Sequence, residues 1–182
     1  MSHFNIPTRE EVSTSNQEIF DNLEKAVGFV PNLYASFTHS EPALGNYLQF
    51  QGGKTSLSNR EKEVVSLVVS QVNECTYCQS AHTTIGKLNG FSEAQILELR
   101  QGYFSTDAKL DALVKLAKAI TLNKGKVDGT TLDSFFSAGY SKGTVVDVIL
   151  AVGSKTVMNY LHNLTQIAID FPVAQELETI EA

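Results

Sequence analysis

Both cysteines of the chain lie in one short motif, Cys75-Thr76-Tyr77-Cys78, and His82 follows four residues later. On a helix, positions 75, 78 and 82 fall at i, i+3 and i+7, so the three side chains share one face. The Cys-x-x-Cys spacing brings two sulfurs close enough to form a disulfide and to lower the pKa of one thiol. His82, one turn beyond Cys78, is placed to accept its proton. With both cysteines in one motif, the pattern indicates redox or metal chemistry rather than a structural disulfide.

Glu63 is the carboxylate that could orient this histidine, although it lies twelve residues before the first cysteine. On one unbroken helix that separation is about 18 Å, too far for cooperation. If the chain turns near Asn73-Glu74, two antiparallel helices bring Glu63 beside His82. The sequence then predicts a relay from Glu63 to His82 to Cys78, in which a carboxylate orients a histidine that activates a thiol. The alternative is that Glu63 is a solvated acid near a helix N-terminus, where the helix dipole favours it.

Three other interpretations of the cysteine motif compete with a redox pair. A zinc site needs four ligands; the motif and His82 supply three, and the candidates for the fourth, none at zinc-finger spacing, are Glu63, Glu74 and His162. The cysteines could instead be inert residues of a core helix, which the nearby histidine disfavours. A thioredoxin fold also runs an apolar strand into Cys-x-x-Cys. It places a cis-proline downstream, however, and this chain has no proline from 43 to 171.

The proline-free interior and the scarcity of hairpin turn sequences favour an all-α fold. Ser58 with Glu61 and Ser92 with Gln95 have the spacing of capping boxes, which begin helices. The β-branched run Val64–Val72 could alone be a buried strand, but the cap before it favours a helix. Helices are expected over 8–27, shortly after Pro31, from Pro42 to the glycines at 52 and 53, from Ser58 through Val72, and over 76–88, 92–101, 107–122, 130–138 and 141 to about 169. After Pro172 we expect a frayed acidic tail.

A weak internal repeat indicates a duplicated helical unit. Gly90–Leu97 resembles Gly139–Val146 at an offset of 49 residues. At the same offset three apolar residues, Val64, Val65 and Leu67, fall on Leu113, Val114 and Leu116. Where the first copy has its two cysteines and its histidine, the second has Lys124, Val127 and Thr131. If the duplication is real, one copy alone kept the chemistry.

Composition limits the class of protein. The chain has 182 residues, 42% of them apolar, and we expect one domain over 1–182 with the redox motif in a core of about 40–125. The formal net charge of −6 and the scattered basic residues argue against nucleic-acid binding. No apolar stretch approaches the roughly 18 residues that a membrane span needs, and no signal peptide is visible. The expected location is the cytoplasm.

The spacing of Glu63, Cys75, Cys78 and His82 resembles the Glu-x11-Cys-x-x-Cys-x3-His signature of alkyl hydroperoxidase D-like proteins. These proteins belong to the carboxymuconolactone decarboxylase superfamily. Its peroxidase-related subgroup is similar in three further segments, Val30–Asn32, Ser40–Pro42 and Asn159–Pro172. The resemblance covers nearly the whole chain. It implies a multihelical all-α bundle with the redox pair at a helix start, in homo-oligomers such as dimers, trimers or hexamers.

The resemblance also implies what each sulfur does. Cys78 would attack the peroxide and become a sulfenic acid, and Cys75 would resolve it to a disulfide and meet an external thiol or dithiol reductant. Helix-dipole reasoning alone would instead favour Cys75 as the thiol of lower pKa. The best-studied members carry histidine where this chain has Tyr77. A phenol with a pKa near 10 is a poor base at neutral pH, so we expect a shorter relay and slow peroxidase turnover.

The expected function is a thiol-dependent peroxidase of small organic hydroperoxides or hydrogen peroxide, with no cofactor and no metal. One alternative is a disulfide reductase that serves another redox protein. Another is a decarboxylase-type or lyase activity, against which the intact cysteine pair counts. The last is a non-enzymatic redox sensor, which stoichiometric oxidation without turnover would support.

Overall fold

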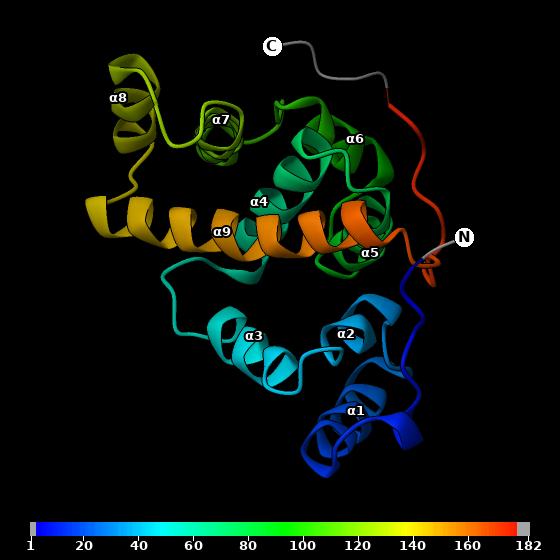
Figure 1. The fold of residues 1–182 in the computed structure, drawn as a ribbon. Helices are drawn as coiled ribbons and strands as arrows, with labels where there is room; N and C mark the ends of the chain where they lie inside the picture. The colour runs from blue at the N-terminus through cyan, green and yellow to red at the C-terminus, as the bar shows by residue number, and fades with distance from the viewer. Residues whose placement is uncertain (1–2, 178–182) are drawn as a thin grey trace. The chain divides into compact units, whose positions relative to one another are not determined.

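The computed structural model describes residues 3–177, and this part of the chain is all-α, with no β-strand (Figure 1). The prediction of an all-α fold is therefore confirmed. The elements are η1 (Arg9–Glu11), α1 (Thr14–Val27), α2 (Asn32–Phe37), α3 (Ala43–Gln51), α4 (Asn59–Val72), α5 (Thr76–Leu88), α6 (Glu93–Gln101), α7 (Ala108–Leu122), α8 (Gly129–Ser137) and α9 (Lys142–Thr165).

Contacts between the elements divide the chain into two compact units. The first comprises the residues up to Gly53 together with Leu161–Asp170, and the second comprises Lys54–Tyr160 together with the described residues from Phe171 onward. The prediction of a single domain over the whole chain stays a prediction. The predicted redox residues Glu63, Cys75, Tyr77, Cys78 and His82 belong to the second unit, whereas His162, a candidate zinc ligand, belongs to the first.

The first unit has a small apolar core in which Phe20 of α1, Ala35 of α2 and Leu44 of α3 are buried. Helix α1 begins later than the sequence predicts. Val12 is extended, and the Ser13 hydroxyl accepts a hydrogen bond from the amide of Asn16, which makes Ser13 the N-cap. The expected helix from residue 8 is wrong because a serine cap competes with helix propagation at that point.

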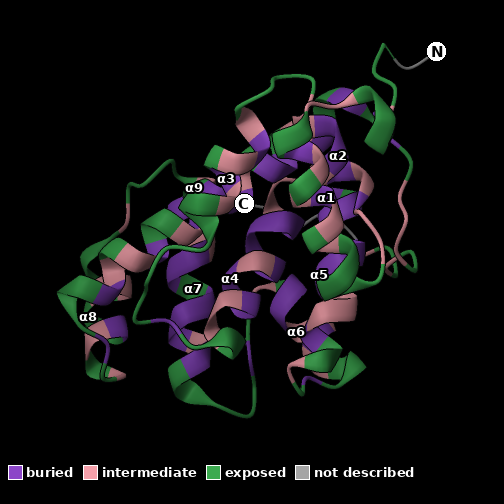
Figure 2. Cartoon of the chain, turned by 90° about the horizontal axis from the view of Figure 1, so that it is seen from below, coloured by how far each residue is buried: buried purple, intermediate pink, exposed green. Residues whose placement is uncertain are grey.

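Helix α4 lies at the centre of the second unit and packs against α5, α6 and α7. Its β-branched run is completely buried at Val64, Val65 and Val68, and Figure 2 shows buried residues along this helix. The capping box before it is formed: the Ser58 amide donates to Glu61 at 2.8 Å, and the Ser58 hydroxyl accepts from the Glu61 amide at 3.3 Å. Burial explains the apolar run, and the cap explains why it is a helix rather than a strand.

The helix boundaries of the second unit repeat along the chain. Helix α4 begins at 59 and α7 at 108, whereas α6 begins at 93 and α9 at 142, an offset of 49 residues in both pairs. Helices α5 and α8 end at 88 and 137, again 49 residues apart. The same offset relates Gly90 and Gly139, both with positive φ. These matched boundaries support the duplication inferred from the sequence.

Helix α9 is the longest element, at 24 residues. It ends at Thr165 rather than near 169, because Gln166 adopts a left-handed φ of 50° that breaks the helical path. By length and composition alone α9 could cross a membrane, with a mean hydropathy of 1.2, although 39% of the best window is buried inside the protein. The expectation that no apolar stretch approaches the length of a membrane span therefore does not hold for α9. The core helix of a soluble protein passes the same test.

Candidate active site

A tight turn between α4 and α5 places the cysteine motif. Asn73 ends α4, Glu74 takes a left-handed φ of 53°, and the Cys75 amide donates to the Ser70 carbonyl at 3.0 Å. Cys75 is the N-cap of α5, and its sulfur accepts a hydrogen bond from the amide of Cys78 at 3.3 Å. The two cysteines therefore occupy the first turn of one helix, as the spacing predicts. The turn also reverses the chain, so α4 and α5 pack against each other.

The two thiols are free and deeply buried, with Cys75 0% and Cys78 2% exposed. Their pKa values move in opposite directions. The hydrogen bond that the Cys75 thiol shares with Cys78, together with burial, raises the pKa of Cys75 far above its usual range. Burial opposes ionisation of Cys78, but the Cys75 thiol, the charge of Lys155 and the Asn159 amide lower its pKa. Cys78 is therefore the thiol that ionises first, contrary to helix-dipole reasoning from sequence alone.

Glu63 and His82 meet across the hairpin, with Oε2 of the carboxylate 2.7 Å from Nδ1 of the ring. Both residues are buried, so the alternative of a solvated Glu63 is wrong. Burial and then the charge of Lys155 lower the pKa of His82, despite the opposing carboxylate. Burial would raise the pKa of Glu63, but His82 and Lys155 lower it overall. The pair is thus an ionised carboxylate beside a neutral imidazole at neutral pH.

The second nitrogen of His82 faces a residue that the sequence analysis missed. Nζ of Lys155, on α9, lies 2.5 Å from Nε2 of His82. The predicted relay therefore continues from Glu63 through His82 to Lys155, rather than directly to Cys78. The sequence did contain a signal for Lys155. In the apolar stretch Val145–Leu161 the charged residues are Asp147 and Lys155 alone. A lone lysine inside an apolar helix is rarely buried without a partner.

Asn159, one turn beyond Lys155, was also missed. It is completely buried, accepts from the Asn73 amide group at 3.0 Å and donates to the Ser70 hydroxyl at 3.3 Å. Its side chain also bonds both thiols, which favours the ionised form of each, although the pKa of Cys75 is raised overall. Asn159 thereby connects α9 to the end of α4 and to the cysteine turn.

Tyr77, between the cysteines, is buried and makes an edge-to-face contact with Phe171, with ring centres 5.7 Å apart. The segment after Phe171 is held along α5. The Ala174 amide donates to the Ser80 hydroxyl at 3.0 Å, and the buried Arg100 donates to the Gln175 carbonyl at 2.8 Å. The expected fraying after Pro172 is therefore wrong as far as residue 177; the rest of the acidic tail, 178–182, lies outside the described residues. Phe171 and Ala174 thus contact Tyr77 and Ser80, which lie on either side of Cys78 in the sequence of α5.

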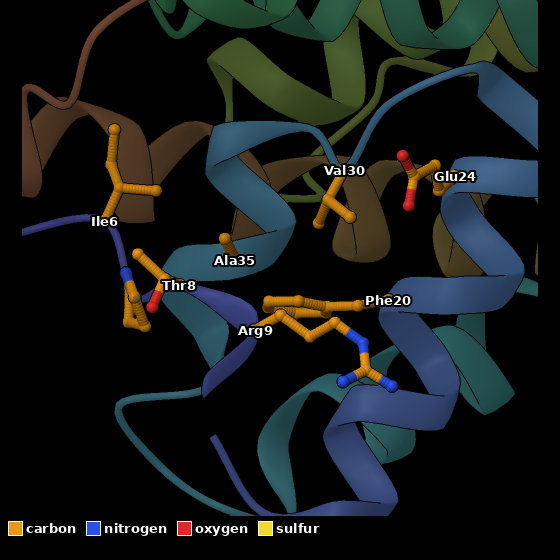
Figure 3. A pocket seen from close by; sticks show the side chains of 8 residues that line it. Ile6, Thr8, Arg9, Phe20, Glu24, Val30 and Ala35 are labelled. Atoms are coloured by element: carbon orange, nitrogen blue, oxygen red, sulfur yellow. The ribbon is translucent and has the colours of Figure 1, made fainter. Parts of the chain in front are cut away.

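Within residues 3–177, no group of three or more His, Cys, Asp or Glu side chains is placed to hold a metal ion. The first unit contains a cavity of about 250 Å³, seen in Figure 3. It is lined by Ile6, Pro7, Thr8, Arg9, Phe20, Glu24, Val30 and Ala35. None of these residues belongs to the thiol site.

Comparisons with known proteins agree with the fold. Residues 42–119 match the carboxymuconolactone decarboxylase family. No curated protein is detectably similar in sequence. A peroxidase-related protein from Silicibacter sp. TM1040 has the same fold, with a TM-score of 0.80 at 20% identity over 92% of this chain and 91% of its own.

Two further solved structures are similar. A peroxidase-related protein from Ralstonia eutropha JMP134, described as an alkylhydroperoxidase AhpD core, has a TM-score of 0.84 at 15% identity, over 93% of this chain and 92% of its own. A variant of the debrominase Bmp8, bound to 2,3,4-tribromopyrrole, has a TM-score of 0.76 at 14% identity, over 93% of this chain and 94% of its own. At these identities the likeness shows the fold alone.

Proposed function

We propose that the chain is a member of the carboxymuconolactone decarboxylase superfamily and that it is a thiol-dependent peroxidase. The match of residues 42–119 to this family and the fold shared with two peroxidase-related proteins support the proposal. Its substrates are hydrogen peroxide and small organic hydroperoxides, and its electrons come from an external thiol or dithiol. Cys78 is the nucleophile and Cys75 is the resolving thiol. Glu63, His82 and Tyr77 support the reaction from around the pair.

The proposed reaction has two steps. The Cys78 thiolate attacks the terminal peroxide oxygen, so an S–O bond forms as the O–O bond breaks; the sulfur is oxidised to a sulfenic acid, and the released alkoxide takes a proton and leaves as an alcohol. Cys75 then attacks the sulfur of Cys78, forming the disulfide and releasing water. The external dithiol reduces the disulfide and completes the cycle.

The observation that carries this proposal is the placement of both sulfurs in the first turn of α5, beside a buried Glu63–His82–Lys155 network. The amide of Cys78 already donates to the sulfur of Cys75, so the resolving thiol lies within one helical turn of the nucleophile. Burial of both thiols favours a small oxidant over the disulfide of another protein. For this reason we place peroxide reduction ahead of disulfide reductase activity.

The test is a thiol titration before and after one equivalent of hydrogen peroxide or of a small organic hydroperoxide. We expect both thiols to disappear, the oxidised peptide to contain a Cys75–Cys78 disulfide by mass spectrometry, and a dithiol to sustain turnover. Cys78→Ser serves as the control and abolishes peroxide consumption. Thiols that survive the peroxide would refute the proposal. Oxidation without turnover by any dithiol would favour the redox sensor.

We also propose that the protein acts in the cytoplasm as a homo-oligomer. The support for the homo-oligomer is an exposed, uncharged apolar stripe on α9 at helical spacing, which comprises Val146, Leu150, Val157 and Tyr160. Apolar stripes of this length usually meet a partner surface.

A further inference from the structure

Lys155 is a buried cation whose role neither the sequence motif nor the family signature assigns. It is 5% exposed, and its ammonium group points at Nε2 of His82 from a distance of 2.5 Å. Burying a lysine is costly unless the charge is compensated. The compensation here comes from Glu63, which faces the other nitrogen of the same ring.

The hydrogen-bond pattern determines what His82 can do. An ionised carboxylate accepts hydrogen bonds and donates none, so Nδ1 of His82 carries the proton that Glu63 receives. In the neutral ring Nε2 is then an acceptor, and Lys155 is its donor. The lone pair of His82 is therefore occupied. A direct transfer of the Cys78 proton to His82 would require Lys155 to leave first.

The positive charge that acts on the cysteine pair comes from the same lysine. The charge of Lys155 lowers the pKa of Cys78, and the Asn159 amide, one turn along α9, does so as well. The two side chains are four residues apart, so they lie on one face of the helix. Helix α9 thus brings a cation and a hydrogen-bond donor to the thiol turn from outside the Cys-x-x-Cys motif. The titratable groups facing Lys155 are Glu63 of α4, and Cys78 and His82 of α5.

We propose that Lys155 is the charge partner of the Cys78 thiolate, and that His82 and Glu63 are positioning residues that hold its ammonium group in place. This inference rests on the proposed function and deepens it. The Cys78 thiol loses its proton to solvent, and the charge of Lys155 stabilises the thiolate that remains. After the thiolate attacks the peroxide, the departing alkoxide takes a proton from solvent and leaves as an alcohol.

The test compares full-length variants in a Cys75→Ser background, where Cys78 is the single thiol. The pH dependence of its alkylation by iodoacetamide reports the thiolate without any peroxide. Lys155→Gln keeps a donor for Nε2 but removes the charge, and we expect its midpoint to move up by roughly 1–3 pH units. Lys155→Arg keeps the charge and should restore most of the shift. His82→Ala keeps the charge of Lys155 and removes only one of the two groups that position it, so it should shift the midpoint less than Lys155→Gln does.

Lys142→Gln, an exposed lysine at the start of the same helix, is the matched control and should leave the midpoint unchanged. If Lys155→Gln fails to fold, Lys155→Met replaces it as the variant without the charge. The alkylation midpoints of His82→Ala and Lys155→Arg are then compared with that of Lys155→Met. Two results would overturn the inference. One is an alkylation midpoint that does not move when the charge of Lys155 is removed. The other is a midpoint that moves as far in His82→Ala as in the variant without that charge. Failure of the proposed function looks different: the alkylation midpoint would still follow Lys155, while the unmodified protein would leave peroxide unreduced.

Discussion

Oε2 of Glu63 lies 2.7 Å from Nδ1 of His82, although 19 residues separate them in the chain. The contact exists because the chain reverses within the three residues after α4, where Glu74 accepts a left-handed backbone. A carboxylate at the start of one helix and an imidazole in the middle of the next then share one buried space. With Lys155 they form a network whose charges compensate each other.

This compensation predicts a coupling between Glu63 and Lys155. Glu63→Gln leaves a buried ammonium without its carboxylate, and we expect a loss of roughly 1–3 kcal/mol in the free energy of unfolding. Adding Lys155→Met should cost less than the sum of the two single losses, with a coupling of roughly 0.5–3 kcal/mol. Urea denaturation of the four proteins measures it. If the losses in the free energy of unfolding were strictly additive, the charges of Glu63 and Lys155 would not interact.

Trapping the sulfenic acid with dimedone shows which cysteine attacks the peroxide and which one resolves the intermediate. Cys75→Ser removes the resolving thiol, so peroxide should leave a sulfenic acid at Cys78 that dimedone labels and excess peroxide over-oxidises. Cys78→Ser should give no label, because burial still raises the pKa of the Cys75 thiol when Cys78 is gone. Mass spectrometry of the labelled peptides reads the result. A label on Cys75 in Cys78→Ser, with none on Cys78 in Cys75→Ser, would reverse the assignment.

Stability should fall on acidification. The folded state lowers the pKa of His82, whereas the unfolded ring returns to its usual value of about 6.5. Below that pH the unfolded chain takes up a proton that the folded protein does not, so stability present above about 6.5 is lost as the pH falls toward the lowered value. The pKa of Glu63 is also lowered from about 4.5, which extends the loss to more acidic solution.

Melting temperatures measured between about pH 7 and about pH 5 check this. His82→Gln should flatten the dependence, because the group that titrates is gone. His39→Gln, a change at an exposed histidine of the first unit, is the control and should retain the original slope. An unchanged slope in His82→Gln would assign the effect to other groups.

The exposed stripe of α9 predicts self-association. Leu150, 49% exposed in the middle of the stripe, should be covered in a homo-oligomer. Leu150→Glu places a charge there and should dissociate it, because burying an unpaired carboxylate is unfavourable. Leu88→Glu, at a leucine that is 83% exposed at the end of α5, is the matched control. Light scattering that finds a 19.9 kDa particle for the unmodified protein at micromolar concentration would contradict the prediction.

Access to the thiols should depend on the segment after Phe171. Phe171→Ala removes the ring that packs on Tyr77 and should loosen the attachment of this segment to α5. We expect faster alkylation of the cysteines by iodoacetamide at fixed pH. Val173→Ala, at a residue that is 75% exposed, should leave the rate unchanged. Equal rates in both variants would mean that reagents reach the cysteines by another route.

Local sequence determined the helices and the cysteine pair. Ser58 and Ser92 begin α4 and α6 through hydrogen bonds that span three residues, and the spacing of Cys75 and Cys78 places both in one turn. Such interactions depend on nearest neighbours along the chain, so they can be read without knowing the fold. The meeting of Glu63 with His82 could also be anticipated, because a single turn connects their helices.

Tertiary structure alone decided which groups complete the site. Lys155 is 73 residues beyond His82, and no local spacing rule connects them. Its position follows from how α9 packs in the second unit, which places the inner face of that helix beside the thiol turn. For the same reason the sequence could not choose the thiol of lower pKa. The helix dipole acts locally and favours Cys75, whereas the charge and amide that lower the pKa of Cys78 come from a distant helix.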